Sequence, residues 1–396
     1  MTQSKHQNPK DTHQPTPVEG KQRYNSLDVL RGVAVLAIFA VNIKMMANGF
    51  NHYRDISLWT GESAQTIGLI HSRLIDGKFL TIFTALFGAG LALLIDRKKP
   101  VPLATVLRRL SWLILFAVIH LIFIREGDIL IWYALAGFLA IPFAKLPARL
   151  LFIIGIGLQV AVFIHYTYVP ISDMEPILWS TASDAHEEVS HIMLGTVGGQ
   201  IAARIEAARY YMIDLFAFGG VWIDTLGTML LGMALLKNGF LSGKLPMKRY
   251  ILWAIAGLAL ASAYYLLRPF LDIEDKFQGL MRSILGYAHR FGGAIVWSAL
   301  IVGAVSAGWK GRWLSAVGRT AFTVYIMQSV IGLLLFSSLG LGWFGQLSLL
   351  QLMITTLLTW VFFLCAAPLW LRYFRFGPLE WAWRSLTYRK IQPFRR

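Results

Sequence analysis

Long apolar runs separated by short polar connections dominate the pattern of this chain. Many of these runs approach the roughly 20 residues that a helix needs to cross a bilayer. The strict alternation of apolar and polar positions that predicts barrel strands is absent. The sequence therefore predicts an all-α, polytopic integral membrane helix bundle. We expect ten transmembrane helices, at about 29–48, 77–95, 109–124, 128–144, 149–168, 210–236, 250–267, 283–308, 314–337 and 348–371.

The composition supports this membrane assignment. The chain of 396 residues is 56% hydrophobic and only 15% charged, whereas soluble domains contain roughly a quarter charged residues. Its single cysteine, Cys365, lies inside the last apolar run. This excludes an intrachain disulfide and a cysteine-based metal cluster.

The distribution of charge predicts the orientation of the bundle. The net charge is +16, which in a soluble protein would suggest nucleic acid as a partner. Here the basic residues concentrate in alternate connections, including "DRKKPVPLATVLRR" and "WRSLTYRKIQPFRR". Lys and Arg gather on the cytoplasmic side of membrane proteins. We therefore expect both termini to be cytoplasmic, and no nucleic acid partner.

The same pattern divides the chain into three parts. Residues 1–25 are polar, lack the apolar core of a signal peptide, and are interpreted as a flexible cytoplasmic tail. Residues 26–371 form the transmembrane bundle, with outer loops at 49–76 and 169–209, and residues 372–396 form a basic cytoplasmic segment. The second outer loop is expected to be partly helical, and both a solvated cap and a functional loop are consistent with it.

The first helix combines a membrane segment with three polar residues, in "SLDVLRGVAVLAIFAVN". Asn42 follows Arg31 by eleven residues, which is about three turns or roughly 16 Å, so both share one helix face. Polar groups at membrane depth often mark a site or pathway. Alternatively, Asp28 caps the helix, Arg31 reaches lipid phosphate and Asn42 holds a neighbouring helix.

A second polar group lies in "HLIFIREGDILIWYA". His120 ends one predicted helix, and Glu126 and Asp128 form the outer turn before the next. A histidine beside a carboxylate can act as a base or an acid near neutral pH. In the alternative interpretation, Asp128 caps the following helix and His120 is an interfacial hydrogen-bonding residue.

Other polar residues suggest different functions. Most histidines fall in the outer half of the predicted bundle, but none forms a His-Glu-x-x-His pattern, and no metal is expected. Asp224 lies near the middle of the predicted helix 210–236 and suggests a proton-coupled transporter. The paired broken helices typical of transporters are not evident, and "FGAGLALL" favours close helix packing instead.

Several of these stretches together resemble the YeiB-like family of bacterial inner-membrane proteins (domain of unknown function 418). They are "LDVLRGVAVLAIFAVNI" (27–43), "GKFLTIFTALFGAGLALL" (77–94), "HLIFIREGDILIWYALAG" (120–137), "GRTAFTVYIMQSVI" (318–331) and "LRYFRFGPLEWAWRSLTY" (371–388). The family is distantly similar to transmembrane acyltransferases such as the lysosomal heparan-α-glucosaminide N-acetyltransferase. That enzyme also has an asparagine eleven residues after an Arg-Gly pair, and a histidine eleven residues further on. Here His52 follows Asn42 by ten.

The resemblance implies transfer of an acyl group, in particular acetyl, from cytosolic acyl-CoA to an extracytoplasmic hydroxyl or amine. Acetyl-CoA or another acyl-CoA would be the co-substrate. In this interpretation Arg31 and Arg319 bind the donor, with Gln328 as a further polar contact, and Asn42 donates to the developing oxyanion. His120 or His52 is the base, and Asp128 orients the imidazole of His120. These implied roles concern the residues Arg31, Asn42, His52, His120, Asp128, Arg319 and Gln328.

Two other functions stay open on the sequence alone. The first is a small-solute or proton-coupled transporter that uses Asp224 and the His120–Asp128 pair. The second is a scaffold that binds anionic lipid through its basic inner rim. The expected partners are membrane lipids and a small-molecule or glycan-like acceptor, and assembly into a homo-oligomer is left open.

Overall fold

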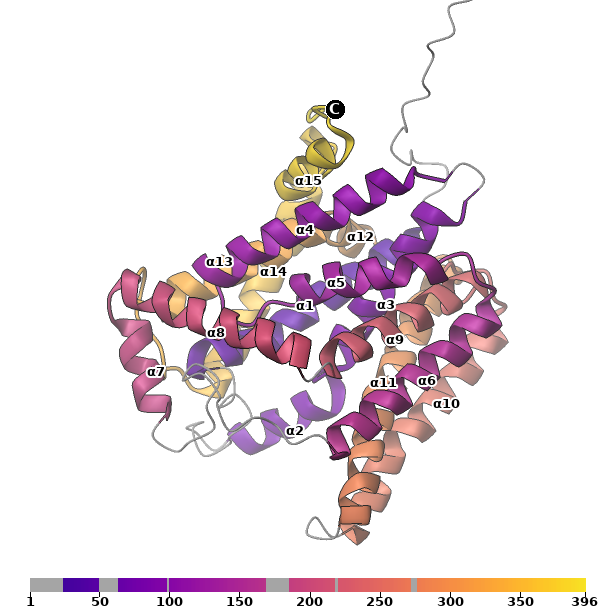
Figure 1. Ribbon diagram of the computed structural model, residues 1–396, viewed down its shortest axis with the longest axis horizontal. Helices are drawn as coiled ribbons and strands as arrows, with labels where there is room; N and C mark the ends of the chain where they lie inside the picture. The colour runs from indigo at the N-terminus through magenta and orange to yellow at the C-terminus, as the bar shows by residue number, and fades with distance from the viewer. Residues whose placement is uncertain (1–23, 50–62, 98–99, 169–184, 218–219, 272–275) are drawn as a thin grey trace, which may run out of the picture.

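A computed structural model describes residues 24–49, 63–97, 100–168, 185–217, 220–271 and 276–396. These residues are almost entirely helical, and an isolated β-bridge joins Phe374 and Arg395. The helices are α1 (Asn25–Asn48), α2 (Ala64–Leu74), α3 (Lys78–Ile95), α4 (Leu103–Phe123), α5 (Leu130–Ala140), α6 (Ala148–Tyr168), α7 (Ala185–Leu194), α8 (Val197–Ala217), α9 (Gly220–Lys237), α10 (Met247–Leu267), α11 (Lys276–Ser306), α12 (Arg312–Arg319), α13 (Ala321–Phe336), α14 (Leu349–Tyr373) and α15 (Pro378–Tyr388), with 3₁₀ turns at Ile141–Phe143 and Arg268–Phe270 (Figure 1).

Seven stretches of the described residues are helical, long and apolar enough to cross a membrane, or eight if the bent pair α12–α13 counts as one. This confirms the prediction of a multi-pass, all-α membrane protein. Two further predicted spans, 128–144 and 149–168, correspond to α5 and α6, whose apolar stretches are shorter.

The prediction of one helix over 210–236 is wrong. The structure ends α8 at Ala217 and begins α9 at Gly220. The two helices have different neighbours, since α9 packs between α3 and α6 while α8 lies against α4 and α7. Arg204 of α8 is buried and lies 3.8 Å from Glu126 in the turn between α4 and α5, which links α8 to that turn. Figure 1 shows α7 and α8 on the opposite side of the molecule from the α10–α11 pair.

The prediction of one helix over 314–337 is also wrong. The chain bends by 81° between α12 and α13, at Thr320. Residues 318–320, Gly-Arg-Thr, interrupt the apolar run here, but so short an interruption does not by itself predict this bend. Its cause is tertiary, because Glu380 of α15 binds the first backbone N–H groups of α13.

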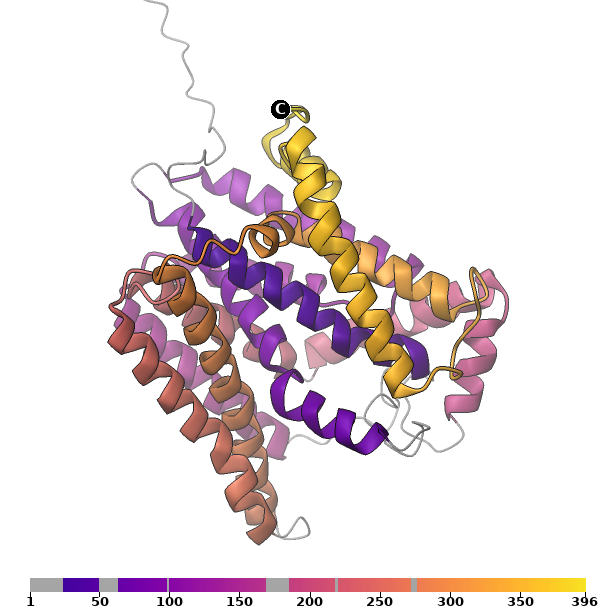
Figure 2. The same ribbon diagram turned by 180° about the vertical axis from the view of Figure 1, so that it is seen from behind.

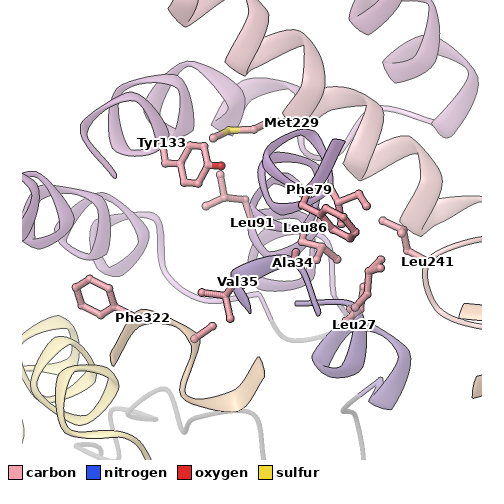
Figure 3. Packing of buried hydrophobic residues seen from close by; sticks show 14 of the residues in the cluster. Leu27, Ala34, Val35, Phe79, Leu86, Leu91, Tyr133, Met229, Leu241 and Phe322 are labelled. Atoms are coloured by element: carbon pink, nitrogen blue, oxygen red, sulfur yellow. The ribbon is translucent and has the colours of Figure 1, made fainter. Parts of the chain in front are cut away.

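The core is built around α1, α3, α5 and α9. Val35, Leu86, Tyr133 and Met229, one from each of these helices, are all at most 2% exposed and pack in one cluster (Figure 3). Glycine permits the closest approach: a Cβ on Gly88 would overlap the backbone of Met229 in α9. This confirms the predicted close packing of the "FGAGLALL" helix through small residues.

The outer helices present apolar side chains to the surroundings. Leu258 of α10 and Leu358 of α14 are 59% and 65% exposed, and many of their neighbours along these helices are exposed as well. Figure 2 shows α10 paired with α11 at one edge of the molecule, and α14 crossing its surface. Such broad exposure of large aliphatic residues is typical of a lipid-facing surface.

Candidate functional site

His120 and Asp128 come together at the turn between α4 and α5. His120 lies in the last turn of α4, and its Nδ1 is 3.4 Å from Oδ2 of Asp128. Both side chains are buried, at 1% and 0% exposed. The hairpin expected from the sequence therefore brings the histidine and the carboxylate to ion-pair distance inside the protein.

The two oxygens of Asp128 have different surroundings. Oδ1 accepts the hydroxyl of Tyr325 at 3.2 Å and the backbone N–H of Leu130 at 2.9 Å. Asp128 thus also holds the start of α5, as the alternative interpretation expected. Oδ2 faces His120, whose Nε2 has no hydrogen-bond partner among the described residues. Nδ1 of His120 lies at ion-pair distance from this oxygen but forms no hydrogen bond with it, and the unpartnered Nε2 is the nitrogen available as a base.

Gln328 extends this polar cluster along α13. It lies three residues after Tyr325, so the two side chains share a helix face. Gln328 is 1% exposed, and neither its amide nitrogen nor its amide oxygen has a hydrogen-bond partner among the described residues. Buried polar atoms are almost always satisfied. The cluster therefore has unused hydrogen-bonding capacity for a polar ligand.

Asn42 lies on the face of α1 that is turned toward the same region. It is half-buried, and no hydrogen bond of its side chain is found within the described ranges. Met45, one turn further on, accepts a hydrogen bond from Nη2 of Arg125 at 3.2 Å. Arg125 belongs to the turn that carries Asp128, so α1 reaches the cluster through Met45, and Asn42 shares the face of that contact.

Arg31 lies near the other end of α1. It forms an ion pair with Asp28, with Nη1 3.2 Å from Oδ1, and its side chain is 28% exposed. Because α1 is one uninterrupted helix, the three-turn separation of Arg31 and Asn42 inferred from the sequence holds.

A basic pocket opens beside the start of α1. Its volume is about 500 Å³. It lies between α1, α12 and the end of α14, and none of its lining residues is Asp or Glu. Its cationic lining residues are Lys310, Arg312, Arg319, Arg372 and Arg396. The structure thus places Arg319 in a strongly positive cavity, separate from the cluster around His120.

Two glycines bring the backbones of α1 and α12 into contact. A Cβ on Gly32 would overlap the carbonyl of Leu314, and one on Gly318 would overlap the carbonyl of Asp28. Each glycine is a sequence neighbour of a predicted donor-binding arginine, Arg31 or Arg319. This close approach explains the glycine of both family stretches, "LDVLRG" and "GRTAF", on steric grounds.

The other buried histidines are held in satisfied networks. Nδ1 of His71 lies 2.7 Å from Oδ1 of Asp76, and its Nε2 lies 3.0 Å from the carbonyl oxygen of Ala40. Lys78 donates to the carbonyl of Ser72 at 2.7 Å and lies 2.8 Å from Nε2 of His289. These contacts join α1, α2, α3 and α11, so we interpret these side chains as residues that hold the helices together.

Asp224 is also paired. Arg290 of α11 donates two hydrogen bonds to its carboxylate, at 2.9 and 2.6 Å. Both side chains are less than a quarter exposed. A bidentate guanidinium–carboxylate pair is strong and geometrically specific, and this pair joins α9 to α11.

The remaining sequence candidates do not join the cluster. His52 lies outside the described residues. His191 is 79% exposed and only 3.8 Å from Glu187 on the same helix turn. Among the described residues, no group of three or more His, Cys, Asp or Glu side chains is arranged to hold a metal ion.

Three residues of the site escaped the sequence analysis. Arg125 directly precedes Glu126 in the α4–α5 turn, and neither Arg125 nor Tyr325 was among the residues that the sequence singled out. Glu380 caps α13 from a helix 58 residues away in sequence. For Tyr325 a signal existed, because its spacing of three from Gln328 in "YIMQ" puts both on one helix face.

Comparisons with known proteins identify the family of this chain. The family "Protein of unknown function (DUF418)" matches residues 235–390. The chain is 30% identical to the uncharacterized protein YeiB of Escherichia coli (strain K12), over 94% of this chain and 98% of that protein. It is 29% identical to the uncharacterized protein YxaH of Bacillus subtilis (strain 168), over 95% and 97% respectively. Similarity over nearly the full length of both proteins confirms the resemblance to the YeiB-like proteins, and the chain belongs to the YeiB-like DUF418 family.

Proposed function

We propose that this protein is a multi-pass membrane acyltransferase that moves an acyl group, in particular acetyl, from cytosolic acyl-CoA to an extracytoplasmic hydroxyl or amine. The observation that carries the proposal is the buried His120–Asp128 pair. One oxygen of Asp128 is held by Tyr325 and the other faces the imidazole. Nε2 of His120 is left without a partner among the described residues, as a base requires.

The basic pocket supports the donor side of the proposal. It gathers five cationic side chains without an acidic one, and the phosphates of CoA would neutralise such a group. Arg319 lines the pocket and ends α12, directly before the helix that carries Tyr325 and Gln328. A donor whose phosphates lie in the basic pocket would extend its thioester toward the His120 cluster along α13 and the Arg31–Asn42 face of α1.

In the proposed reaction the acyl group would pass directly from the sulfur of CoA to the acceptor. Nε2 of His120 takes the proton of the acceptor hydroxyl or amine while the acceptor oxygen or nitrogen forms a bond to the acyl carbon. The bond from that carbon to sulfur breaks, and the proton passes from His120 to the departing thiolate. Asp128 stabilises the imidazolium between these events. The amides of Asn42 and Gln328 are the candidate donors to the oxyanion.

The proposed topology follows from the charge pattern. Both termini would be cytoplasmic, and α5 and α6 would complete ten crossings of a bacterial inner membrane. The basic pocket would then face acyl-CoA in the cytosol, and the His120 cluster would lie in the outer half.

Nothing specific in the geometry favours the transporter alternative over acyl transfer. Asp224, the carboxylate on which that alternative depended, is bound by two hydrogen bonds from Arg290. A transporter would have to break this pair in each cycle, whereas an acyltransferase uses it only to hold α9 and α11 together.

Binding of acyl-CoA is the most direct test of the proposed function. We expect acetyl-CoA to raise the melting temperature of the detergent-purified protein, and Arg319→Gln to reduce this shift strongly. Arg249→Gln is the matched control, since Arg249 is an exposed cation at the start of α10 and does not line the basic pocket. The proposal fails if millimolar acetyl-CoA and longer acyl-CoA produce no shift, or if the control variant loses the shift equally.

A further inference from the structure

Arg125 is a buried cation that forms no ion pair with the residues that the structure describes. Its side chain is in the turn between α4 and α5 and the residue is 3% exposed. The hydrogen bond of its guanidinium goes to the thioether sulfur of Met45, which is a weak acceptor. No ion pair joins Arg125 to a carboxylate of the residues that the structure describes.

The neighbouring carboxylates are engaged elsewhere. Glu126 lies 3.8 Å from Nε of Arg204, which reaches this region from α8. Asp128 binds Tyr325 and faces His120. Both carboxylates beside Arg125 therefore have their closest partners elsewhere among the described residues, and neither lies within ion-pair distance of its guanidinium.

A buried, unpaired guanidinium is costly, because burial removes its water without replacing it by an acceptor. Proteins retain such groups where a ligand supplies the missing charge. The polar atoms around Arg125 have the same character: Gln328 and His120 have no hydrogen-bond partners among the described residues, and Asn42 is on the facing helix. These residues come from α1, α13, the end of α4 and the α4–α5 turn.

We propose that Arg125 binds a carboxylate or phosphate group of the acceptor, so that the acceptor is an anionic hydroxyl or amine compound. The planar guanidinium fork suits both of these oxyanions. The contact with Met45 positions the Arg125 side chain but does not neutralise its charge. Identifying the ligand as the acceptor rests on the proposed acyl transfer, but the anion site itself does not.

Direct binding to small probes tests this site. Glycerate and glycerol 1-phosphate carry a hydroxyl group with a carboxylate or a phosphate, and glycerol is their neutral counterpart. We expect both anions, but not glycerol, to stabilise the detergent-purified protein. Arg125→Gln should weaken anion binding by about 10–100-fold, the range for one charged hydrogen bond. Arg209→Gln is the matched control, because Arg209 is an exposed arginine of α8.

The stability of the ligand-free variants gives a second measurement. Removing an unpaired buried charge should not destabilise the protein, so Arg125→Met should melt at or above the wild-type temperature. A strongly lowered melting temperature would show that Arg125 has a structural role. The inference is also overturned if neither anion binds at millimolar concentration, or if Arg125→Gln leaves anion binding unchanged.

The two proposals can fail separately. If the anions bind through Arg125 while acyl-CoA does not bind, the anion site stands and acyl transfer is wrong. If acyl-CoA binds and the anions do not, acyl transfer stands and the acceptor is not anionic at this position.

Discussion

The carboxylate of Glu380 in α15 accepts the hydroxyl of Thr323 at 2.6 Å at the start of α13. Its other oxygen accepts the backbone N–H groups of Phe322 and Thr323 at 2.7 and 3.1 Å. A carboxylate at this position satisfies free N–H groups and complements the helix dipole. Trp383, one turn later, donates to the carbonyl of Arg109 in α4 at 2.8 Å. The helix α15 therefore positions the two helices that carry His120, Tyr325 and Gln328.

We predict that Glu380 makes stability depend on pH. Burial raises the pKa of Glu380, and the hydrogen bonds from Thr323 and Phe322 only partly oppose this. The folded chain then binds the proton more tightly than the unfolded chain, so the contribution of Glu380 is complete below its unfolded pKa of about 4.3. It is lost as the pH rises through the folded pKa.

The melting temperature of wild type should therefore fall relative to Glu380→Gln as the pH is raised from about 5 to about 8. Glu187→Gln is the control, because Glu187 is 84% exposed. A constant difference between wild type and Glu380→Gln over this range would contradict the prediction.

Gly318→Ala should destabilise the protein. The added methyl group meets the carbonyl of Asp28, which belongs to the backbone of α1 and cannot rotate away. Overpacking of this kind costs about 1–3 kcal/mol. Gly157→Ala in α6 is the comparison, because its Cβ would meet nothing within 4 Å, and it should have a neutral or stabilising effect. Equal melting temperatures for the two variants would refute the steric explanation.

His120→Gln should lower the rate of acyl transfer by about 10²–10⁴-fold, the usual contribution of a positioned base. Asp128→Asn should also lower it, and the double variant should be little worse than the worse single variant, since the two residues act as a unit. The measurement is the initial rate of labelled acetyl transfer from acetyl-CoA to glycerate or glucosamine. His191→Gln, on an exposed helix, is the control. Full activity of His120→Gln would remove His120 from the mechanism.

The Asp224–Arg290 pair should contribute to the stability of the fold by joining α9 to α11. Asp224→Asn and Arg290→Gln should each destabilise, by about 1–2 kcal/mol for a partly screened charged hydrogen-bonded pair. The double variant should lose less than the sum of the single variants. Acetyl-CoA binding should persist in all three. Proton-driven solute flux in proteoliposomes that disappears with Asp224→Asn would instead favour a transporter.

The sequence predicted the helices whose ends coincide with the ends of apolar runs. The range 348–371 corresponds to Leu349–Tyr373, and 77–95 to Lys78–Ile95. It missed the interruptions, because a short polar or glycine-containing stretch does not by itself break a membrane helix. Residues 318–320, Gly-Arg-Thr, interrupt the apolar run at the bend, but the contact that stabilises the break is made by Glu380, a residue far away in sequence.

The candidate site, like the fold, could be predicted from the sequence only in part. The pairing of His120 with Asp128 was predictable because a short hairpin forces its helix ends together. The cation Arg125 was not, because charge at the end of a membrane helix is ordinarily solvated or paired. Only the coordinates show that it is buried against a sulfur atom.

The bend at Thr320 also constrains the order in which the chain can complete its fold. A straight membrane helix satisfies its own backbone as soon as it forms, but α13 begins with N–H groups that need Glu380, 58 residues later in the chain. Until α15 has docked, these groups lack their acceptor. Assembly of the bundle therefore cannot proceed strictly helix by helix, because α15 must dock before the start of the earlier helix α13 is complete.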